Sequence, residues 1–396
     1  MAPLLSRIRR HVHRNPEVSG EEFATTAYLS KLLGAAHVPH QVAPGNRGIV
    51  TAIAEASDPE APVIAFRADI DALPIQEANR IPYRSRRAGV MHACGHDAHS
   101  AILLGTAIAL HRAGSPPIGW RGIFQPSEEM GHGAREIVGF GALEGVQAIV
   151  ALHVDPQLPV GRVGITPGPR TAFCQDFSIQ VRGRGGHGAR PHTTIDPIAA
   201  AAQLITLIYQ VIPRQTDSRD PVVVTIGMIN GGHSANVIPD AVALKGTIRS
   251  LSPAVGAHAR QTLERVCAGL AGASGAEISA LFDPLLNGVT NDPRISAICT
   301  AVARELLGRD QVVTDDRPSM GSEDFADYLS VVPGCMIALG VKPPGRKVAP
   351  LHTNTFDIDE DALLLGARLL TQVVLEWPRT EANSAAKPQR NVISEK

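Results

Sequence analysis

The chain has 396 residues, of which 44% are hydrophobic and 19% charged, a composition typical of a folded globular protein rather than a disordered one. Its 37 lysine and arginine residues nearly balance its 38 aspartate and glutamate residues. This balance argues against a nucleic acid or a membrane as partner, so a small molecule is the better hypothesis.

Chain length and cysteine usage limit the organisation and location further. A chain of this length is too long for one ordinary core, so we expect two domains or one domain with a large insertion. Residues 1–16 predict an amphipathic basic helix rather than a signal peptide, and no later apolar run is long enough to cross a bilayer. The five cysteines are scattered and odd in number, which argues against a disulfide framework and predicts a cytoplasmic, reducing location.

The first part of the chain alternates short apolar strands with helical segments. We expect strands at residues 49–54, 63–68, 122–125 and 148–153, and a helix at 98–111 that Asp97 caps. This alternation predicts an α/β layer architecture with a largely parallel or mixed sheet.

From about Cys174 the pattern changes to the order β-α-β-β-α-β, which is the ferredoxin-like plan. We expect strands at 177–181, 222–229, 242–248 and 276–282, and helices at 197–212, opened by Asp196, and at 255–270. After Asn291 the α/β pattern returns, with helices at 295–307 and 360–376. We therefore predict a catalytic domain at 1–173 and 291–378, a ferredoxin-like satellite domain at 174–290, and a loose tail at 379–396.

The most informative segment is MHACGHDAH at residues 91–99. The thiol of Cys94 and the imidazole of His96 are separated by one glycine, which lets both donors turn toward one point. Zinc and similar ions prefer these ligands. A single motif of this kind is more often a buried cysteine beside surface histidines, but the three neighbouring histidines and Asp97 favour a metal site.

A second predicted strand runs into two adjacent carboxylates, Glu128 and Glu129. Adjacent residues at a strand end point in different directions, so one can hold a metal while the other faces the open coordination position. Metal-assisted hydrolysis needs this division, because a general base must take a proton from the attacking water. Alone, such a pair is usually a solvated turn.

Further candidates follow apolar strands of the same layer. Asp69 and Asp71 share a face after the strand at 63–68 and could orient a metal-bound histidine, or could form only a capped turn. His153 ends an apolar run, and His352 follows another. Strand ends gather active sites in open α/β sheets, although a lone histidine is more often structural.

The satellite domain offers a glycine-rich loop at residues 183–192. It lacks the Gly-Lys-Ser/Thr of a phosphate-binding P-loop, so close presentation of His187 to a substrate is the alternative interpretation. Asn236 and Arg249 lie near strand ends of the same domain. Arginine suits bidentate binding of a carboxylate, although a surface arginine with no such role is commoner.

Together these segments resemble the M20 metallopeptidase superfamily, nearest to its amidohydrolase branch of hippurate, N-acyl-amino-acid and IAA-amino-acid hydrolases. The matching motifs extend from residues 9–22 to His352, and the strongest are HACGHD, QPSEE, GRGGH and the MGSEDF of residues 320–325. The resemblance implies a mixed-sheet α/β catalytic domain with an inserted ferredoxin-like α+β satellite domain that acts as a lid or in dimerisation.

The resemblance also implies an activity and a cofactor. We expect an enzyme that hydrolyses the amide bond of small N-acyl amino acids with two divalent metal ions, Zn²⁺ or Mn²⁺, with Co²⁺ or Ni²⁺ as further candidates. The implied metal ligands are Cys94, His96, Glu129, His153 and His352.

The other site residues receive roles from the same resemblance. It makes Glu128 the general base and places Asp71 in the outer shell of the metal site. His187 is expected to steady the tetrahedral intermediate, and Asn236 and Arg249 to hold the substrate.

The chain departs from the family's sequence pattern at two places, and two alternative functions stay open. The chain has Gly188-Ala189-Arg190 where relatives usually have a small-small-apolar run, and Thr353-Asn354 where they often place a proline. A dipeptidase or carbamoyl-amino-acid hydrolase of a neighbouring branch is one alternative. A non-catalytic binding relative is the other, although a binder needs no general base. A homo-oligomer formed through the satellite domain is a further expectation.

Overall fold

The computed structural model describes residues 1–314, 317–345 and 349–385, which form two units. The larger unit comprises Met1–Arg170, Thr290–Arg317 and Glu323–Lys396, and the smaller unit comprises Thr171–Val289 and Pro318–Ser322. The short segment Pro318–Ser322 joins the smaller unit through backbone and side-chain contacts. The amide of Ala172 donates to the carbonyl of Gly321 at 2.9 Å, and Arg249 donates to the carbonyl of Met320 at 3.0 Å.

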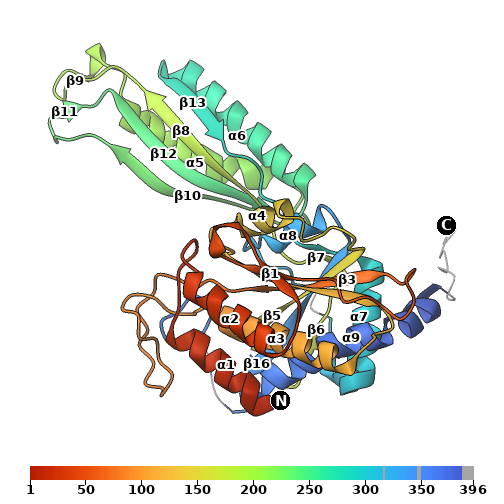
Figure 1. The fold of residues 1–396 in the computed structure, drawn as a ribbon. Coiled ribbons are helices and arrows are strands. Elements are labelled where there is room, and N and C mark those ends of the chain that lie inside the picture. Colours follow the sequence, from red (N-terminus) through yellow and green to blue (C-terminus); the bar gives the residue numbers. More distant parts are fainter. Residues whose placement is uncertain (315–316, 346–348, 386–396) are drawn as a thin grey trace, which may run out of the picture. The chain divides into compact units, whose positions relative to one another are not determined.

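An eight-stranded mixed sheet forms the core of the larger unit, in the order β1-β2-β4-β3-β5-β16-β6-β15 (Figure 1). The four central strands, β4, β3, β5 and β16, run parallel to one another. Their apolar runs are nearly continuous because both faces of a parallel sheet are buried. The strands are β1 His40–Val42, β2 Ile49–Thr51, β3 Val63–Asp69, β4 Gly119–Gln125, β5 Ala148–Pro159, β6 Val163–Gly164, β15 Val312–Val313 and β16 Gly334–Lys342.

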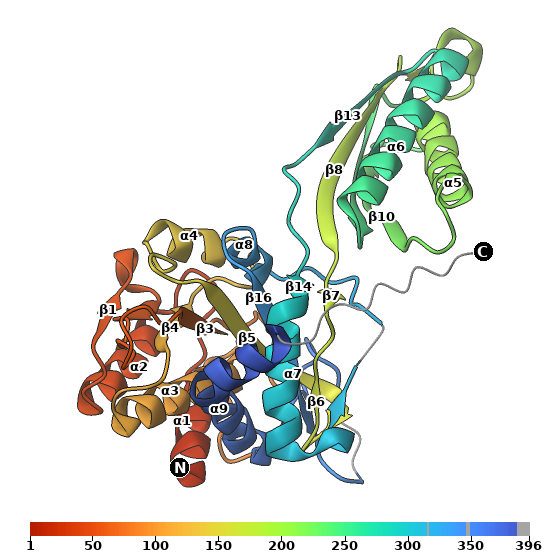
Figure 2. The same cartoon turned by 90° about the vertical axis from the view of Figure 1, so that its right-hand side faces the viewer.

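Helices cover both faces of this sheet. Figure 2 shows α3, α9 and α7 on one side of the strands and α4 and α8 on the other. Helices α1 and α2 pack on α3 and complete the first layer. The helices are α1 Ala2–Arg14, α2 Phe23–Ala35, α3 His96–Ala113, α4 Gly133–Gly139, α7 Pro293–Leu307, α8 Phe325–Leu329 and α9 Asp361–Ala385. The mixed α/β architecture predicted for this part of the chain is confirmed.

Two helix ends differ from the prediction. Helix α3 begins at His96 with Gly95 as its N-cap, so Asp97 does not cap it. The carboxylate of Asp97 binds Arg9 and His13 instead, and these partners outcompete the local backbone. Helix α9 continues past Pro378 to Ala385, where we expected the loose tail to have begun. The rest of the predicted tail, residues 386–396, lies outside the described residues.

The smaller unit has the predicted ferredoxin-like plan. Its antiparallel sheet has the order β10-β12-β8-β13, and helices α5 and α6 pack on one face of it (Figure 2). Asp196 caps α5 by accepting from the amides of Ile198 and Ala199, as its sequence position predicted. The elements are β8 Phe173–Arg182, α5 Pro197–Gln215, β10 Val222–Gly231, β12 Ala241–Ser250, α6 Pro253–Ser274 and β13 Glu277–Phe282.

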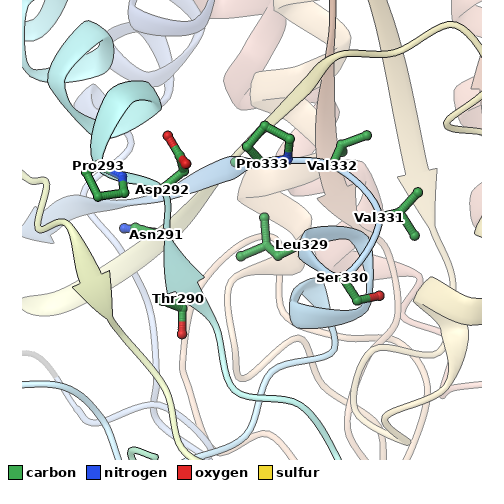
Figure 3. A pocket seen from close by; sticks show the side chains of 10 residues that line it. Thr290, Asn291, Asp292, Pro293, Leu329, Ser330, Val331, Val332 and Pro333 are labelled. Atoms are coloured by element: carbon green, nitrogen blue, oxygen red, sulfur yellow. The ribbon is translucent and has the colours of Figure 1, made fainter.

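Two smaller features complete the fold. A surface hollow of about 380 Å³ lies in the larger unit where the chain enters α7 and leaves α8 (Figure 3). Beside it, the buried side chain of Asn291 ties β14 (Thr290–Asn291) to β16, because it exchanges hydrogen bonds with the backbone of Met336 at 2.7 and 3.0 Å. No helix among the described residues is long and apolar enough to cross a membrane.

Candidate metal centre

Three parallel strands bring polar side chains to one level of the larger unit's sheet. Asp69, at the end of β3, pairs with Gln125 at the end of β4. Arg67 of β3 pairs with Ala151 of β5, so His153, two residues further, lies level with Asp69. The apolar run predicted that His153 ends its strand, and this is wrong. Strand β5 continues to Pro159 because β16 remains paired with it beyond the ends of β3 and β4.

A left-handed turn after β4 presents the two adjacent glutamates. Ser127 has φ = 55°, a conformation that is strained for a residue with a side chain. Its amide donates to Glu22 at 2.8 Å, and its hydroxyl accepts from Arg47 at 3.2 Å. Since Glu22 is completely buried, it holds this turn from within the protein. Glu128 and Glu129 follow directly, and both carboxylates lie 3.9 Å from Nε2 of His96.

Close packing of Gly95 brings Cys94 and His96 next to β5. Gly95 has φ = 89°, and a Cβ atom there would lie 2.3 Å from Cγ2 of Val154. Any larger residue would therefore clash with β5 and also be strained. As a result Sγ of Cys94 lies 3.6 Å from Nε2 of His153.

Hydrogen bonds fix the ring orientation of two histidines. Nδ1 of His96 lies 3.0 Å from the carbonyl oxygen and 3.1 Å from Oδ1 of Asp71, and Nδ1 of His153 lies 2.9 Å from the carbonyl oxygen of Val154. These oxygens only accept, so each Nδ1 carries a proton and Nε2 is the ring atom that can bind a metal. Metal-bound histidines are held in this way.

The donor atoms of the predicted ligands form overlapping groups, each within 4.8 Å. Cys94 belongs to two groups, one with His96 and His153 and one with Glu129 and His352. Nε2 of His96 and Oε1 of Glu129 are buried and have no hydrogen-bond partner among the described residues. Buried polar atoms are rarely left without a partner. A mixed set of thiol, imidazole and carboxylate donors fits a zinc-like transition ion.

His352 is the exposed member of the cluster. Its side chain is 55% exposed, and its Nε2 lies 3.6 Å from Oε1 of Glu129. Its backbone has φ = 61° and donates to the carbonyl of Ala93 at 2.8 Å. The hydrogen bond to Ala93 holds this loop residue beside the segment that carries Cys94.

His99 lies in the same cluster but is occupied by other partners. Its Nδ1 donates to Asp69 at 2.6 Å, and its Nε2 accepts from the amide of Val154 at 2.9 Å. With both ring nitrogens bound, His99 has no lone pair for a metal. It instead orients Asp69, which also accepts from Arg67.

Burial and neighbouring charges shift the protonation of the cluster. Burial and the carboxylate of Glu323 raise the pKa of Glu128 well above its ordinary value. Burial also raises the pKa of Glu129, although the charge of His96 opposes this. Burial likewise raises the pKa of the Cys94 thiol. For His96, burial lowers the pKa but the charge of Asp69 and the other anionic groups outweigh it and raise it. A cation among these groups would favour their deprotonated forms.

A buried arginine, Arg67, lies beside the cluster and was not among the residues predicted for the site. Arg67 donates to Gln125 at 2.7 Å, to Asp69 at 2.6 Å, and to Glu323 and Asp324 at 2.9 Å each. A charged residue inside the apolar run of β3 was the available signal, because a buried charge requires partners.

The satellite-domain candidates lie in two places within the smaller unit. His187, on β9 (Gly186–His187), pairs with Val237 of β11 (Val237–Ile238), and the carbonyl of Asn236 accepts from Gly188 at 2.8 Å. His187 and Asn236 are therefore close neighbours beyond the Ala241 end of β12. Arg249 is near the other end of β12. It lies eight residues along the strand from Ala241, a distance of about 26 Å at roughly 3.3 Å per residue. The smaller unit therefore does not bring all three residues together.

Comparison with known proteins gives consistent matches over most of the chain. A family model described as peptidase family M20/M25/M40 matches residues 65–376. N-acetyl-L-cysteine deacetylase of Bacillus subtilis is 37% identical, covering 92% of this chain and 85% of its own. An IAA-amino acid hydrolase of Arabidopsis thaliana is 33% identical, covering 96% and 86%. A crystal structure of the Bacillus subtilis YXEP protein, described as a dinuclear metal binding peptidase, has a TM-score of 0.84 at 34% identity over 96% of this chain and 99% of that one.

The raised pKa values of Cys94 and His96 predict proton release on metal binding. Because ions displace protons from these donors, affinity should increase with pH by about tenfold per unit for each proton displaced. The metal-free protein is titrated with Zn²⁺ in a calorimeter at pH 6.5 to 8.5, in two buffers of different ionisation enthalpy. The difference in the heat of binding between the buffers gives the number of protons released. Affinity that does not change over this range would contradict the prediction.

Proposed function

This chain belongs to peptidase family M20/M25/M40 and is thus a hydrolase of amide bonds, and we propose that it cleaves small N-acyl amino acids with two bound divalent cations. The products would be a carboxylic acid and a free amino acid. The structure supports this proposal through one observation in particular. Nε2 of His96 and Oε1 of Glu129 are buried without a hydrogen-bond partner among the described residues, in a cluster that also holds a thiol.

The proposed ligands would hold two ions. The donor groups support this, since Cys94 belongs to two of them. The ligands are Cys94, His96, Glu129, His153 and His352. Bound cations of this kind acidify water and polarise the amide carbonyl. Zn²⁺ or Mn²⁺ is proposed, with Co²⁺ or Ni²⁺ also able to use such mixed donors.

Glu128 is proposed as the general base. Its carboxylate lies 3.9 Å from Nε2 of His96, and its raised pKa suits a group that must accept a proton from water and return it to the leaving amine. Asp71 is proposed to orient His96 and Glu129, because its carboxylate accepts from the ring of the first and, at 3.0 Å, from the amide of the second.

The substrate class is supported by the relatives and by basic residues of the satellite domain. Two of the relatives are named for removing an acyl group from an amino acid. We propose that Arg249 binds the substrate carboxylate, since a guanidinium has five N–H donors and can do so while holding Met320. His187 is proposed to donate to the oxyanion of the tetrahedral intermediate and Asn236 to hold the substrate.

We further propose that the chain forms a homo-oligomer through the satellite domain. Strand β10 is an edge strand, and its side chains Val223, Met228 and Ile229 are exposed. Exposed apolar edges of this kind tend to pair with another chain. Light scattering should show an oligomer for the wild type and smaller particles for Ile229→Lys. A monomeric wild type would contradict it.

A cytoplasmic location is also proposed. All five cysteines are buried and free, as is usual for proteins in reducing surroundings. Fractionation of cells that express the protein would test this location.

A substrate panel tests the proposed activity. We expect hydrolysis of N-acetyl, N-benzoyl or indole-acyl amino acids, loss of activity with a chelator, and recovery on adding Zn²⁺ or Mn²⁺. Metal analysis should find about two ions per chain. Dipeptides or carbamoyl amino acids as the only substrates would instead identify a neighbouring branch, and a metallated protein inactive on the whole panel would support a binding role.

The adjacent glutamates give a sharper test, because they are chemically identical and have different proposed roles. Glu128→Gln should keep its metals and its KM but lose at least about a hundredfold in kcat. Glu129→Gln should lose metal, and excess cation should partly restore its activity. Metal content and steady-state kinetics of both variants are measured in one buffer. Normal turnover by metallated Glu128→Gln would exclude it as the base, and exchanged phenotypes would reverse the two roles.

A further inference from the structure

Helix α1 carries a buried arginine, Arg9, whose guanidinium is surrounded by carboxylates. Its Nε donates to Asp97 at 3.0 Å, its Nη1 donates to Glu360 at 3.1 Å, and its Nη2 donates to Asp357. Arg9 is 1% exposed, so these groups replace water around its charge. A planar guanidinium holds several carboxylates in a fixed geometry. Arg9 therefore sets the relative positions of acidic residues from two distant segments.

A second buried cation, His13, lies one helical turn further along α1. Its Nδ1 is 2.8 Å from Asp97, and its Nε2 is 3.3 Å from Glu77. Both ring nitrogens face carboxylates, so both carry protons and the ring is charged. Burial alone would lower the pKa of His13, but Asp97 and Glu77 raise it to about 9.

The anionic partners of Arg9 adjoin two proposed metal ligands. Asp97 directly follows His96 in the first turn of α3, so a shift of the Asp97 backbone moves His96. Asp357 lies five residues after His352 in the segment that leads into α9. Arg9 thus connects the segment that follows His96 with the segment that follows His352.

His13 reaches the same segment through Glu77. The next residue, Ala78, donates its amide to the carbonyl of Asn354 at 2.8 Å, and Asn79 donates to the carbonyl of Phe356 at 3.0 Å. Asn79 also donates to Glu77 at 3.2 Å. The His13 contacts therefore form a second connection between Asp97 and the residues that follow His352.

Apolar side chains also dock α1 on the protein. Leu5, Ile8 and Val12 are buried on the same face of the helix and pack in the core. Burying ions is costly, and apolar residues of similar volume often stabilise a fold as well or better. A charge network at this position is better explained by the geometry that it imposes.

We propose that Arg9 and His13 are positioning residues of the metal centre, fixing the segment that carries His96 relative to the segment that carries His352. This inference rests on the proposed function, in which both histidines are ligands. Neither cation contacts a donor atom of the cluster, so their effect is on ligand geometry.

The test measures metal affinity and kinetics separately on variants of the full-length protein. In Arg9→Met the dissociation constant for Zn²⁺, from chelator competition, should rise about tenfold or more, as is usual when outer-shell partners are lost. At saturating metal its kcat should remain reduced while KM is unchanged. Arg9→Lys keeps the charge without the planar fork and should be intermediate. Because Arg9→Met can fail to fold, His13→Gln, which keeps the Arg9 contacts, should show the same pattern more weakly.

Two variants of the same helix serve as controls. Arg10 is adjacent, is half-exposed and also binds Glu360, but its contacts do not include Asp97 or Asp357. Arg10→Met should keep metal affinity and kcat within about twofold. Leu5→Ala removes a fully buried side chain and should lower the thermal stability of the metal-free protein without changing metal affinity beyond that range.

The results separate this inference from the proposed function. Suppose that the wild-type protein binds two ions and hydrolyses its substrate. A folded Arg9→Met variant with unchanged metal affinity and kcat would then overturn the positioning role alone. Equal losses of metal affinity in Leu5→Ala and Arg9→Met at equal loss of stability would also overturn it, since the role would be purely structural. A wild-type protein that binds no metal would overturn the proposed function itself.

Discussion

The close approach of Gly95 to Val154 is the constraint on which the candidate metal centre depends. With no side chain at Gly95, the start of α3 can lie against β5 at the level where β3 and β4 end. The thiol of Cys94 then meets the ring of His153, and the ring of His96 meets the carboxylates that follow β3 and β4. A methyl group at position 95 would hold the start of α3, with Cys94 and His96, away from the side chains that the strands carry.

Burial then makes each charge in this region dependent on its neighbours. Arg67 is the buried cation that binds Asp69, Glu323 and Asp324, and His99 adds a second hydrogen bond to Asp69. Against these, Glu128, Glu129 and the thiol of Cys94 are anionic when deprotonated, and the pKa of each is raised. Divalent cations bound among these groups would favour the deprotonated forms of Glu128, Glu129 and Cys94.

Local sequence predicted much of this arrangement. The predictions were wrong or incomplete where residues far away in the chain determine the partner of a side chain. The helix cap at Asp196 and the ferredoxin-like order were predicted because each depends on neighbouring residues or on periodicity. Asp97 carries the same capping signal, but Arg9, 88 residues earlier, binds it instead. Strand β16 was missed because its run of apolar residues, buried on both faces, has no alternating pattern. The occupied nitrogens of His99 likewise depend on Asp69 and on β5, which the motif alone does not show.

The exposure of His352 sets it apart from the other proposed histidine ligands. The other imidazoles of the centre belong to the core sheet and a core helix, while His352 belongs to a loop open to solvent. Because exposed side chains change rotamer freely, His352 would be the proposed ligand that the surrounding protein holds least firmly.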